Sequence, residues 1–407
     1  MDGPGAIGAS EFDALMAPLG PFGVAPVLVA GVSGGPHSLA LALLLARWAA
    51  ARGGRVVAGV VDHGLRADSA AEAATVRRWM AARGIEARVA ALGLDPGPGA
   101  QARAREGRLR ALLAICDAVG APWLALGQHR ADQAETLLLR GLAGSGPAGM
   151  AGMAAARPAG GALVIRPLLG VAPARLEAVV AAAGLAALRD PSNGNKAFAR
   201  VRLRAALDDA AGDGPAVAAL AAAAAAFGRR RERAEAAVAA RIAAAAELHP
   251  EGFARVDAGA LGRDGVAAAA FAALIRVVSG AAYAPPAGAA AGLLARGAGT
   301  LGGARLMRGG LLLREAAAMA PPVPAAPGAC WDGRFVLEGT PPPGCVIGPL
   351  GADRVPRPGW LPACVAATMP AIRRDTVLVA APGLSYPSSG AGPGFRLRFA
   401  PAGGACA

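Results

Sequence analysis

The stretch VLVAGVSGGPHSLAL at residues 27–41 decides the fold of the first half of the chain. A short apolar run ends in Ser33-Gly34-Gly35, and a helical pattern begins near Ser38. A strand that passes through a glycine turn into a helix presents backbone N–H groups and hydroxyls at the helix N-terminus, where anions bind. The stretch is neither a Walker A loop nor a GxGxxG fingerprint. Taken alone, it fits a purely structural turn as well as an anion site.

The pattern around this stretch predicts an α/β fold. Short β-branched runs at 27–32, 55–62, 85–92, 123–128 and 163–169 alternate with helical stretches at 39–50, 69–84, 104–120 and 131–142. Such alternation is typical of a parallel, Rossmann-like sheet with helices on both faces. Ligands of these sheets bind at the carboxyl ends of the strands. The SGG turn, the VDHG turn at 61–64 and the GQH turn at 127–129 are therefore expected at one edge.

The alternating pattern of strands and helices ends near residue 205. An alanine-rich stretch with a basic middle, residues 216–248, predicts one long or broken helix, either a functional connector or a mere spacer. A helical patch, Pro/Gly-rich linkers and three strand-like runs follow. We expect an N-terminal extension at 1–24, an α/β domain at 25–210, a helical connector at 211–320, and a small α+β C-terminal module at 321–407.

Composition indicates the class of partner. The 41 basic residues outnumber the 28 acidic ones, giving a net charge of +13. Clustered cations favour a polyanion such as nucleic acid, although the near absence of lysine also fits the codon bias of a GC-rich genome. No window offers the roughly 20 apolar residues of a spanning helix, and the N-terminus lacks a signal-peptide pattern. We expect a cytoplasmic protein with no membrane partner. Five cysteines without a CxxC pair predict neither a zinc site nor a disulfide framework.

Further motifs occur in a fixed order along the first half. They are VDHGLR (61–66), AREGRL (104–109), GQHRADQAET (127–136), IRPLLG (165–170), DPSN (190–193) and FARVRLR (198–204). Together with SGGPHS they resemble the N-type ATP pyrophosphatases with a PP-loop, and within them the tRNA(Ile)-lysidine synthetases. The resemblance implies an enzyme that uses ATP to adenylate the wobble cytidine of a CAU-anticodon tRNA(Ile) at its C2 oxygen. An amine of free lysine then displaces AMP to give lysidine. ATP, Mg²⁺, free lysine and tRNA(Ile) are the implied ligands, and a homodimer is considered as the oligomeric state. The resemblance also implies that the domain at 25–210 is the ATP-binding catalytic domain and that the helical connector at 211–320 is a tRNA-binding region.

The resemblance also implies the site residues. The expected ATP-binding residues are Ser33, Gly34, Gly35, Pro36, His37, Ser38, Asp62 and His63. Asp132 is the candidate for holding the lysine ammonium or accepting its proton, and the catalytic group also contains Arg105 and His129. The expected tRNA and substrate residues are Arg108, Glu135, Asn193, Arg200, Arg202 and Arg204. Mg²⁺ is not firmly assigned and is expected near Asp62 or Asp132.

Structural alternatives remain for several of these residues. Arg105 and Arg108 also fit a solvated basic helix face, and so do the arginines of 198–204. Glu135 fits a stabilising charge in the first turns of a helix. A lone histidine such as His129 is more often a hydrogen-bonded structural residue than a reacting group.

The chain departs from the family pattern in three places. His37 stands where the family has an aspartate, and a neutral imidazole is a poor Mg²⁺ ligand. The segment Gln128–Gln133 keeps one of two acids, as Asp132, and Arg200-Val201-Arg202 lacks an amide. A base-thiolating enzyme of the same superfamily is an alternative function, although Cys116 lacks a partner cysteine. A catalytically impaired tRNA-binding homologue, suggested by His37, is the other.

Overall fold

The computed structural model describes residues 5–64, 68–93, 97, 99–188, 202–203, 206–207, 209, 211–387 and 394–401. The chain divides into two compact units, Met1–Arg231 and Glu232–Ala407, which we call unit 1 and unit 2. The domain boundaries expected from the sequence stay predictions. No helix in the described part of the chain is long and apolar enough to span a bilayer.

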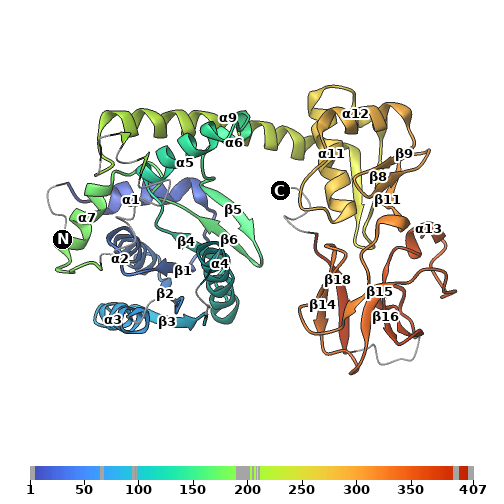
Figure 1. Ribbon diagram of the computed structural model, residues 1–407, viewed down its shortest axis with the longest axis horizontal. Coiled ribbons are helices and arrows are strands. Elements are labelled where there is room, and N and C mark those ends of the chain that lie inside the picture. The colour runs from blue at the N-terminus through green and yellow to red at the C-terminus, as the bar shows by residue number, and fades with distance from the viewer. Residues whose placement is uncertain are drawn as a thin grey trace. The chain divides into compact units, whose positions relative to one another are not determined.

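Unit 1 is built on a six-stranded sheet with the order β3-β2-β1-β4-β6-β5 (Figure 1). Its strands are β1 (Val27–Val32), β2 (Arg55–Asp62), β3 (Glu86–Ala91), β4 (Trp123–Leu126), β5 (Ala156–Ala159) and β6 (Ala162–Ile165). All neighbouring pairs are parallel except β5 with β6, which pair antiparallel. The predicted parallel α/β fold is therefore confirmed. The antiparallel edge strand β5 is an addition to it.

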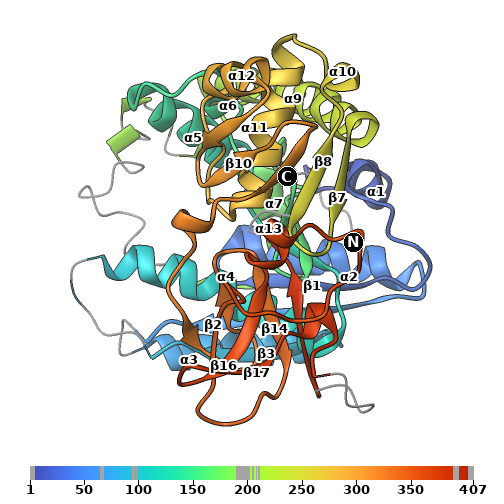
Figure 2. The ribbon, with the colours of Figure 1, turned by 90° about the vertical axis from the view of Figure 1, so that its right-hand side faces the viewer.

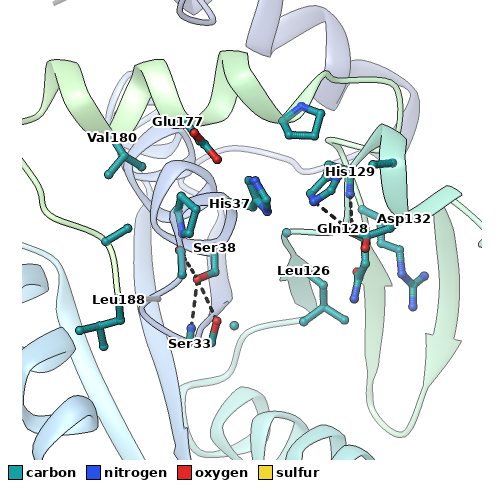
Figure 3. Close-up of a pocket in the computed structure, with 18 of the residues that line it drawn as sticks. Ser33, His37, Ser38, Leu126, Gln128, His129, Asp132, Glu177, Val180 and Leu188 are labelled. Carbon is teal, nitrogen blue, oxygen red and sulfur yellow. Dashed lines mark hydrogen bonds and ion pairs between the residues drawn. The ribbon is translucent and has the colours of Figure 1, made fainter. Parts of the chain in front are cut away.

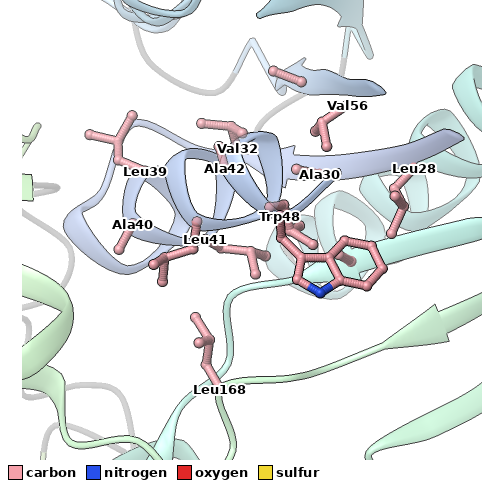
Figure 4. Packing of buried hydrophobic residues seen from close by; sticks show 14 of the residues in the cluster. Leu28, Ala30, Val32, Leu39, Ala40, Leu41, Ala42, Trp48, Val56 and Leu168 are labelled. Atoms are coloured by element: carbon pink, nitrogen blue, oxygen red, sulfur yellow. The ribbon is translucent and has the colours of Figure 1, made fainter. Parts of the chain in front are cut away.

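Helices cover both faces of this sheet. They are α1 (Ala9–Met16), α2 (Pro36–Ala50), α3 (Ser69–Ala81), α4 (Ala100–Val119), α5 (Arg130–Leu142), α6 (Pro147–Met150) and α7 (Pro173–Ala182), with a 3-10 turn η1 at Ala17–Leu19. Side chains alternate along β1, because successive residues of a strand point to opposite faces. Leu28, Ala30 and Val32 pack in the cluster that holds α1, α2, α3 and α7 (Figure 4), whereas Val29 packs against α4. The central strand β1 is thus buried on both faces, as is typical of a parallel sheet, whereas the edge strands β3 and β5 are largely exposed.

A helix of 31 residues, α9 (Pro215–Ala245), follows in the sequence. The alanine-rich stretch 216–248, predicted as one long or broken helix, is a single helix as far as Ala245, and its last three residues lie in strand β7 (Ala246–His249). Its first part packs on unit 1, where Val217 joins Ala131 and Ala134 of α5 in a small buried cluster. Its last residues belong to unit 2, where Ile242 and Ala245 enter that unit's core.

Unit 2 begins with an antiparallel sheet of order β7-β8-β11-β10-β9. The strands are β7 (Ala246–His249), β8 (Phe253–Val256), β9 (Gly299–Leu301), β10 (Ala304–Leu306) and β11 (Leu311–Arg314), and the helices are α10 (Ala258–Leu261), α11 (Gly265–Ser279) and α12 (Ala287–Arg296). Helix α11 packs across this sheet through an apolar face that includes Phe271, Leu274 and Ile275 (Figures 1 and 2). Asp264 caps the helix by accepting the N–H of Ala267 at 2.7 Å.

The rest of unit 2 consists of two small sheets. One has the order β12-β15-β16-β17 and the other β13-β14-β18. The elements are β12 (Val323–Pro324), β13 (Cys330–Trp331), β14 (Phe335–Gly339), β15 (Val346–Pro349), β16 (Pro370–Arg374), β17 (Val377–Ala380) and β18 (Phe395–Phe399), with α13 at Ala363–Ala366 and 3-10 turns η3 (Ala316–Ala318) and η4 (Pro382–Leu384). The helical region and the β-rich C-terminal part that the sequence predicted are both present. The region 211–320 is not purely helical, however, because the five strands β7 to β11 also lie within it.

A buried ion-pair network joins these parts of unit 2. The Asp332 carboxylate accepts hydrogen bonds from Arg314 at 2.9 and 2.8 Å and from Arg334 at 2.8 Å. Arg334, which is fully buried, also donates to the carbonyl oxygens of Gly252 and Thr368. One carboxylate therefore ties the five-stranded sheet to both small sheets.

Candidate active site

Unit 1 contains a cavity of about 1100 Å³ at the carboxyl edge of its sheet. Its walls come from the β1–α2 turn, the β4–α5 turn, α4, α7, strand β5, the residue after β6, and residues 185–188 (Figure 3). This is the edge where parallel sheets bind their ligands. The turns that the sequence placed together, SGG and GQH, do meet in this cavity.

The β1–α2 turn is a closed ring of hydroxyls and backbone groups. Ser38 Oγ accepts the N–H of Ser33 at 3.1 Å and donates to the carbonyl oxygen of Gly35 at 2.9 Å. The Ser33 and Ser38 hydroxyl oxygens are 3.2 Å apart. Gly34 has φ +83°, and a Cβ there would lie 2.6 Å from Leu188 Cδ1. Pro36 is the first residue of α2, so the turn leads directly into a helix N-terminus that faces the cavity.

Two histidines lie side by side across this cavity. The rings of His37 and His129 have centroids 4.0 Å apart and meet edge to face at 72° (Figure 3). His129 is the N-cap of α5, and its backbone N–H donates to Asp132 Oδ2 at 3.0 Å. His129 Nε2 lies 3.5 Å from the same oxygen. The three residues form one cluster that links the β1–α2 turn to the start of α5.

Two further predicted residues, Arg105 and Arg108, line the cavity from α4. Both side chains are solvent accessible. Arg108 nevertheless lies inside the concavity, where desolvation and the neighbouring charge of Arg105 lower the pKa of its guanidinium. The two arginines of the AREGRL motif therefore line the cavity and are also accessible to solvent.

Other predicted residues lie apart from the cavity. Glu135 is buried within α5 and does not line it. Asp62 and His63 lie at the end of β2, outside the lining, and Asp62 Oδ1 accepts the N–H of Gly64 at 3.0 Å. Arg202 is exposed in a short helical fragment. Asn193, Arg200 and Arg204 lie outside the described residues.

Three charged residues of the cavity had no role assigned from the sequence. They are Arg157 on β5, Arg166 after β6 and Glu177 on α7. Arg166 is buried and donates through Nη1 to the carbonyl oxygen of Ala154 at 2.9 Å. Burial, followed by the charges of Arg157 and Arg105, lowers the pKa of Arg166 to about 10. Arg166 lies in the IRPLLG motif, which was a usable signal, whereas nothing in the sequence around Arg157 or Glu177 marked them.

A metal ion would find few protein ligands here. Among the described residues, no group of three His, Cys, Asp or Glu side chains is placed to hold a metal. The carboxylates among the described lining residues are Asp132 and Glu177. This donor set suits an ion that is held mainly by a ligand's phosphates and by water, as Mg²⁺ often is, and not a preformed protein cage.

Comparison with known proteins agrees with the geometry of unit 1. A family model described as the PP-loop domain matches residues 9–211. The tRNA(Ile)-lysidine synthase of a Bradyrhizobium species is 43% identical over 211 residues, which are 51% of this chain and 58% of that protein. Those of Bradyrhizobium diazoefficiens and Rhodopseudomonas palustris are each 44% identical over 193 residues, 47% of this chain and 54% and 56% of the respective proteins.

The matched part is limited in length. The chain spans little more than half the length of these curated relatives. Among solved structures, the U34-tRNA thiolase NcsA of Methanococcus maripaludis, with its 4Fe-4S cluster, aligns with 55% of this chain and 77% of its own at 16% identity and a TM-score of 0.43.

Proposed function

The chain carries a PP-loop domain over residues 9–211, and from this premise we propose that it is an ATP-dependent enzyme that forms lysidine in tRNA. The substrates would be ATP, free lysine and the wobble cytidine of a CAU-anticodon tRNA(Ile), and the reaction would take place in the cytoplasm. One observation carries the proposal. The hydroxyl-lined turn at Ser33–Ser38 and the Asp132–His129 cluster, far apart in sequence, line the same cavity.

The first chemical step would be adenylation. The C2 oxygen of the cytidine attacks the α-phosphorus of ATP, and diphosphate leaves. Negative charge grows on the leaving group, so the site needs fixed donors more than a strong nucleophile. The N-terminus of α2, with Ser33 and Ser38, would hold the diphosphate. Arg105 and Arg108 would stabilise charge at the α-phosphate and on the activated cytidine.

The second step would transfer lysine. The amine attacks C2 of the adenylated cytidine, AMP leaves with its bonding electrons, and the amine nitrogen loses a proton. Asp132 would receive that proton or hold the incoming ammonium. Its carboxylate is oriented by the N–H of His129 at 3.0 Å, and it lies at the first turn of α5 facing the cavity. His129 would act by positioning Asp132, and Glu177 offers a second carboxylate for a cationic substrate.

Mg²⁺ fits this site as part of a metal–nucleotide complex. When bound, the ion would neutralise phosphate charge. Asp132 is the candidate protein ligand, because Asp62 lies outside the cavity lining. His37 offers nitrogen, which Mg²⁺ accepts poorly, so we propose that the His37 imidazole contacts phosphate instead. ATP phosphates and water would supply the remaining coordination.

The test is incorporation of radiolabelled lysine into a CAU-anticodon tRNA(Ile) transcript, with purified full-length protein, ATP and Mg²⁺. We expect incorporation that depends on ATP and is accompanied by AMP release. A His37→Asp variant is assayed in parallel. If the variant incorporates lysine and the wild type does not, the result would instead support the second candidate function, a catalytically impaired tRNA-binding protein. Inactivity of both proteins would contradict lysidine formation.

A further inference from the structure

Four arginines converge on one side of the cavity. Arg105 and Arg108 come from α4, Arg157 from β5 and Arg166 from the residue after β6. Their charges are close enough to influence one another, because Arg105 lowers the pKa of both Arg108 and Arg166, and Arg157 also lowers that of Arg166. Like charges gathered in this way destabilise the empty site unless an anion compensates them.

The protein itself offers this cluster little compensation. Within the described part of the chain, no carboxylate lies within ion-pair distance of any of the four guanidinium groups. Arg166 is more than nine-tenths buried, and within the same part of the chain its Nε has no hydrogen-bond acceptor. A buried charged donor without an acceptor is costly. An external acceptor would remove that cost.

The charge balance of the cavity favours a polyanion. Among the described lining residues, four arginines face two carboxylates, Asp132 and Glu177. Free lysine carries a net positive charge and would be repelled by the arginines. The helix α2 N-terminus already offers a separate place for a nucleotide's phosphates. Guanidinium groups bind phosphate oxygens in a bidentate manner.

We propose that Arg157 and Arg166, which lie beside Arg105 and Arg108, form a second phosphate-binding subsite that holds the backbone of the RNA substrate next to the nucleotide being modified. Arg166 is the fixed anchor, because its bond to the Ala154 carbonyl sets the plane of its guanidinium. Arg157 is the exposed contact at the rim. The subsite rests on the proposed function in that it requires an RNA substrate in this cavity.

The test measures RNA and ATP binding separately. The probes are a fluorescent CAU-anticodon stem-loop RNA, titrated over a range of salt concentrations, and Mg·ATP in equilibrium dialysis without RNA. We expect Arg157→Gln to weaken RNA binding about tenfold and to reduce the salt slope by about 0.7, the value for one lost phosphate contact on a single strand. We expect Arg166→Gln to weaken RNA binding at least as much. ATP affinity should stay within about twofold.

The matched control is Arg110→Gln. Arg110 lies on α4 but outside the cavity lining, and it pairs with Glu106 at 3.8 Å. The Arg110→Gln substitution removes the same unit of charge as the two test substitutions. A loss of RNA affinity that occurs only in the Arg157 and Arg166 variants therefore locates the contact in the cavity. Equal losses in all three variants would overturn the subsite in favour of general electrostatic attraction.

Other outcomes are equally decisive. Loss of ATP affinity with unchanged RNA affinity would assign the arginines to the nucleotide and overturn the proposal, and unchanged binding of both probes would do the same. If Arg166→Gln does not fold, Arg157→Gln decides alone, because its side chain is exposed. If the wild-type protein incorporates no lysine but both variants lose RNA affinity, the subsite is retained and the proposed reaction is rejected. If the wild-type protein incorporates lysine and both variants keep their RNA affinity, the proposed reaction is supported and the subsite is rejected.

Discussion

Replacing Asp332 by Asn tests the buried network that holds unit 2 together. The carboxylate accepts three hydrogen bonds from Arg314 and Arg334, and a fourth from the N–H of Ala320 at 2.9 Å. Its side chain is 1% exposed. Asn has nearly the same shape and tolerates the left-handed backbone at this position, where φ is +56°. The substitution therefore removes the charge while disturbing the backbone little.

The expected loss of stability is large. Removing one partner of a buried ion pair costs about 3–5 kcal/mol, because the remaining charge is left uncompensated, and here two arginines are left. For a unit of this size each kcal/mol lowers the melting temperature by about 2–4 °C. We expect the transition of unit 2 to fall by roughly 6–20 °C in calorimetry of the full chain. Mg·ATP should raise only the transition of unit 1, which distinguishes the two.

The matched control is Asp375→Asn. Asp375 also has a left-handed backbone, with φ +53°, but its side chain is exposed. It should melt within about 2 °C of the wild type. A shift of less than about 3 °C for Asp332→Asn would refute the reasoning, because it would mean that the two arginines do not depend on this carboxylate.

Acid provides a second readout of the same network. Burial raises the pKa of the Asp332 carboxyl, but the hydrogen bonds and charges of Arg314 and Arg334 outweigh it, and the net pKa lies below the ordinary value. The stabilisation is complete above the unfolded-state pKa of about 3.9 and is lost as the pH falls through the lower folded-state value. The wild-type unit 2 should thus lose stability more steeply below about pH 4 than the Asn variant does.

Three further predictions concern unit 1. Asp132→Asn should abolish lysine incorporation while leaving stem-loop RNA affinity unchanged in a binding titration, and an unchanged rate would reject its assigned role. Gly34→Ala should lower ATP affinity at least tenfold in equilibrium dialysis. The new Cβ would lie 2.6 Å from Leu188, and the residue would keep a positive φ. An affinity equal to that of the wild type would show that the turn can rearrange. Burial raises the pKa of the Cys116 thiol to about 11, so at pH 8 a disulfide reagent should label Cys116 far more slowly than exposed Cys330, as peptide mass mapping would report.

Much of unit 1 could be predicted because its signals are local. The buried strands β1, β2 and β6 are short apolar runs that contain valine or isoleucine, and the helices between them have the apolar periodicity of ordinary helices. The edge strand β5, Ala156–Ala159, gave no such signal, because it has four residues, includes a proline and is mostly exposed. In unit 2, the strands of two to five residues after Ala320 depend on distant partners. Val323 of β12, for example, pairs with Ile347 across a stretch that looks like a linker in the sequence.

The candidate site was predictable where a motif carried it. The turn at Ser33–Ser38 was indicated by its strand–glycine–helix pattern, and Asp132 was implied by the motif that resembles the family. The contact between the His37 and His129 rings was not, because it depends on the parallel pairing of β1 with β4. Arg157 was missed for a related reason: it reaches the cavity only because β5 folds back on β6. Sequence spacing reports residues on one element, whereas these contacts arise from sheet order.

The close approach of Gly127 to the β1–α2 turn bears on how the site exchanges its ligands. A Cβ at Gly127 would lie 3.0 Å from the carbonyl oxygen of His37 and 3.2 Å from Ser38 Cα, so two backbones touch there. We expect the β1–α2 turn and the end of strand β4 to move together, so that the Ser33 and Ser38 hydroxyls and the Asp132 carboxylate keep their relative positions. In the proposed reaction, diphosphate and AMP would not leave through an opening between these two backbones. Product release would then depend on the opposite wall of the cavity, where α7 and the long side chains of α4 can move more independently.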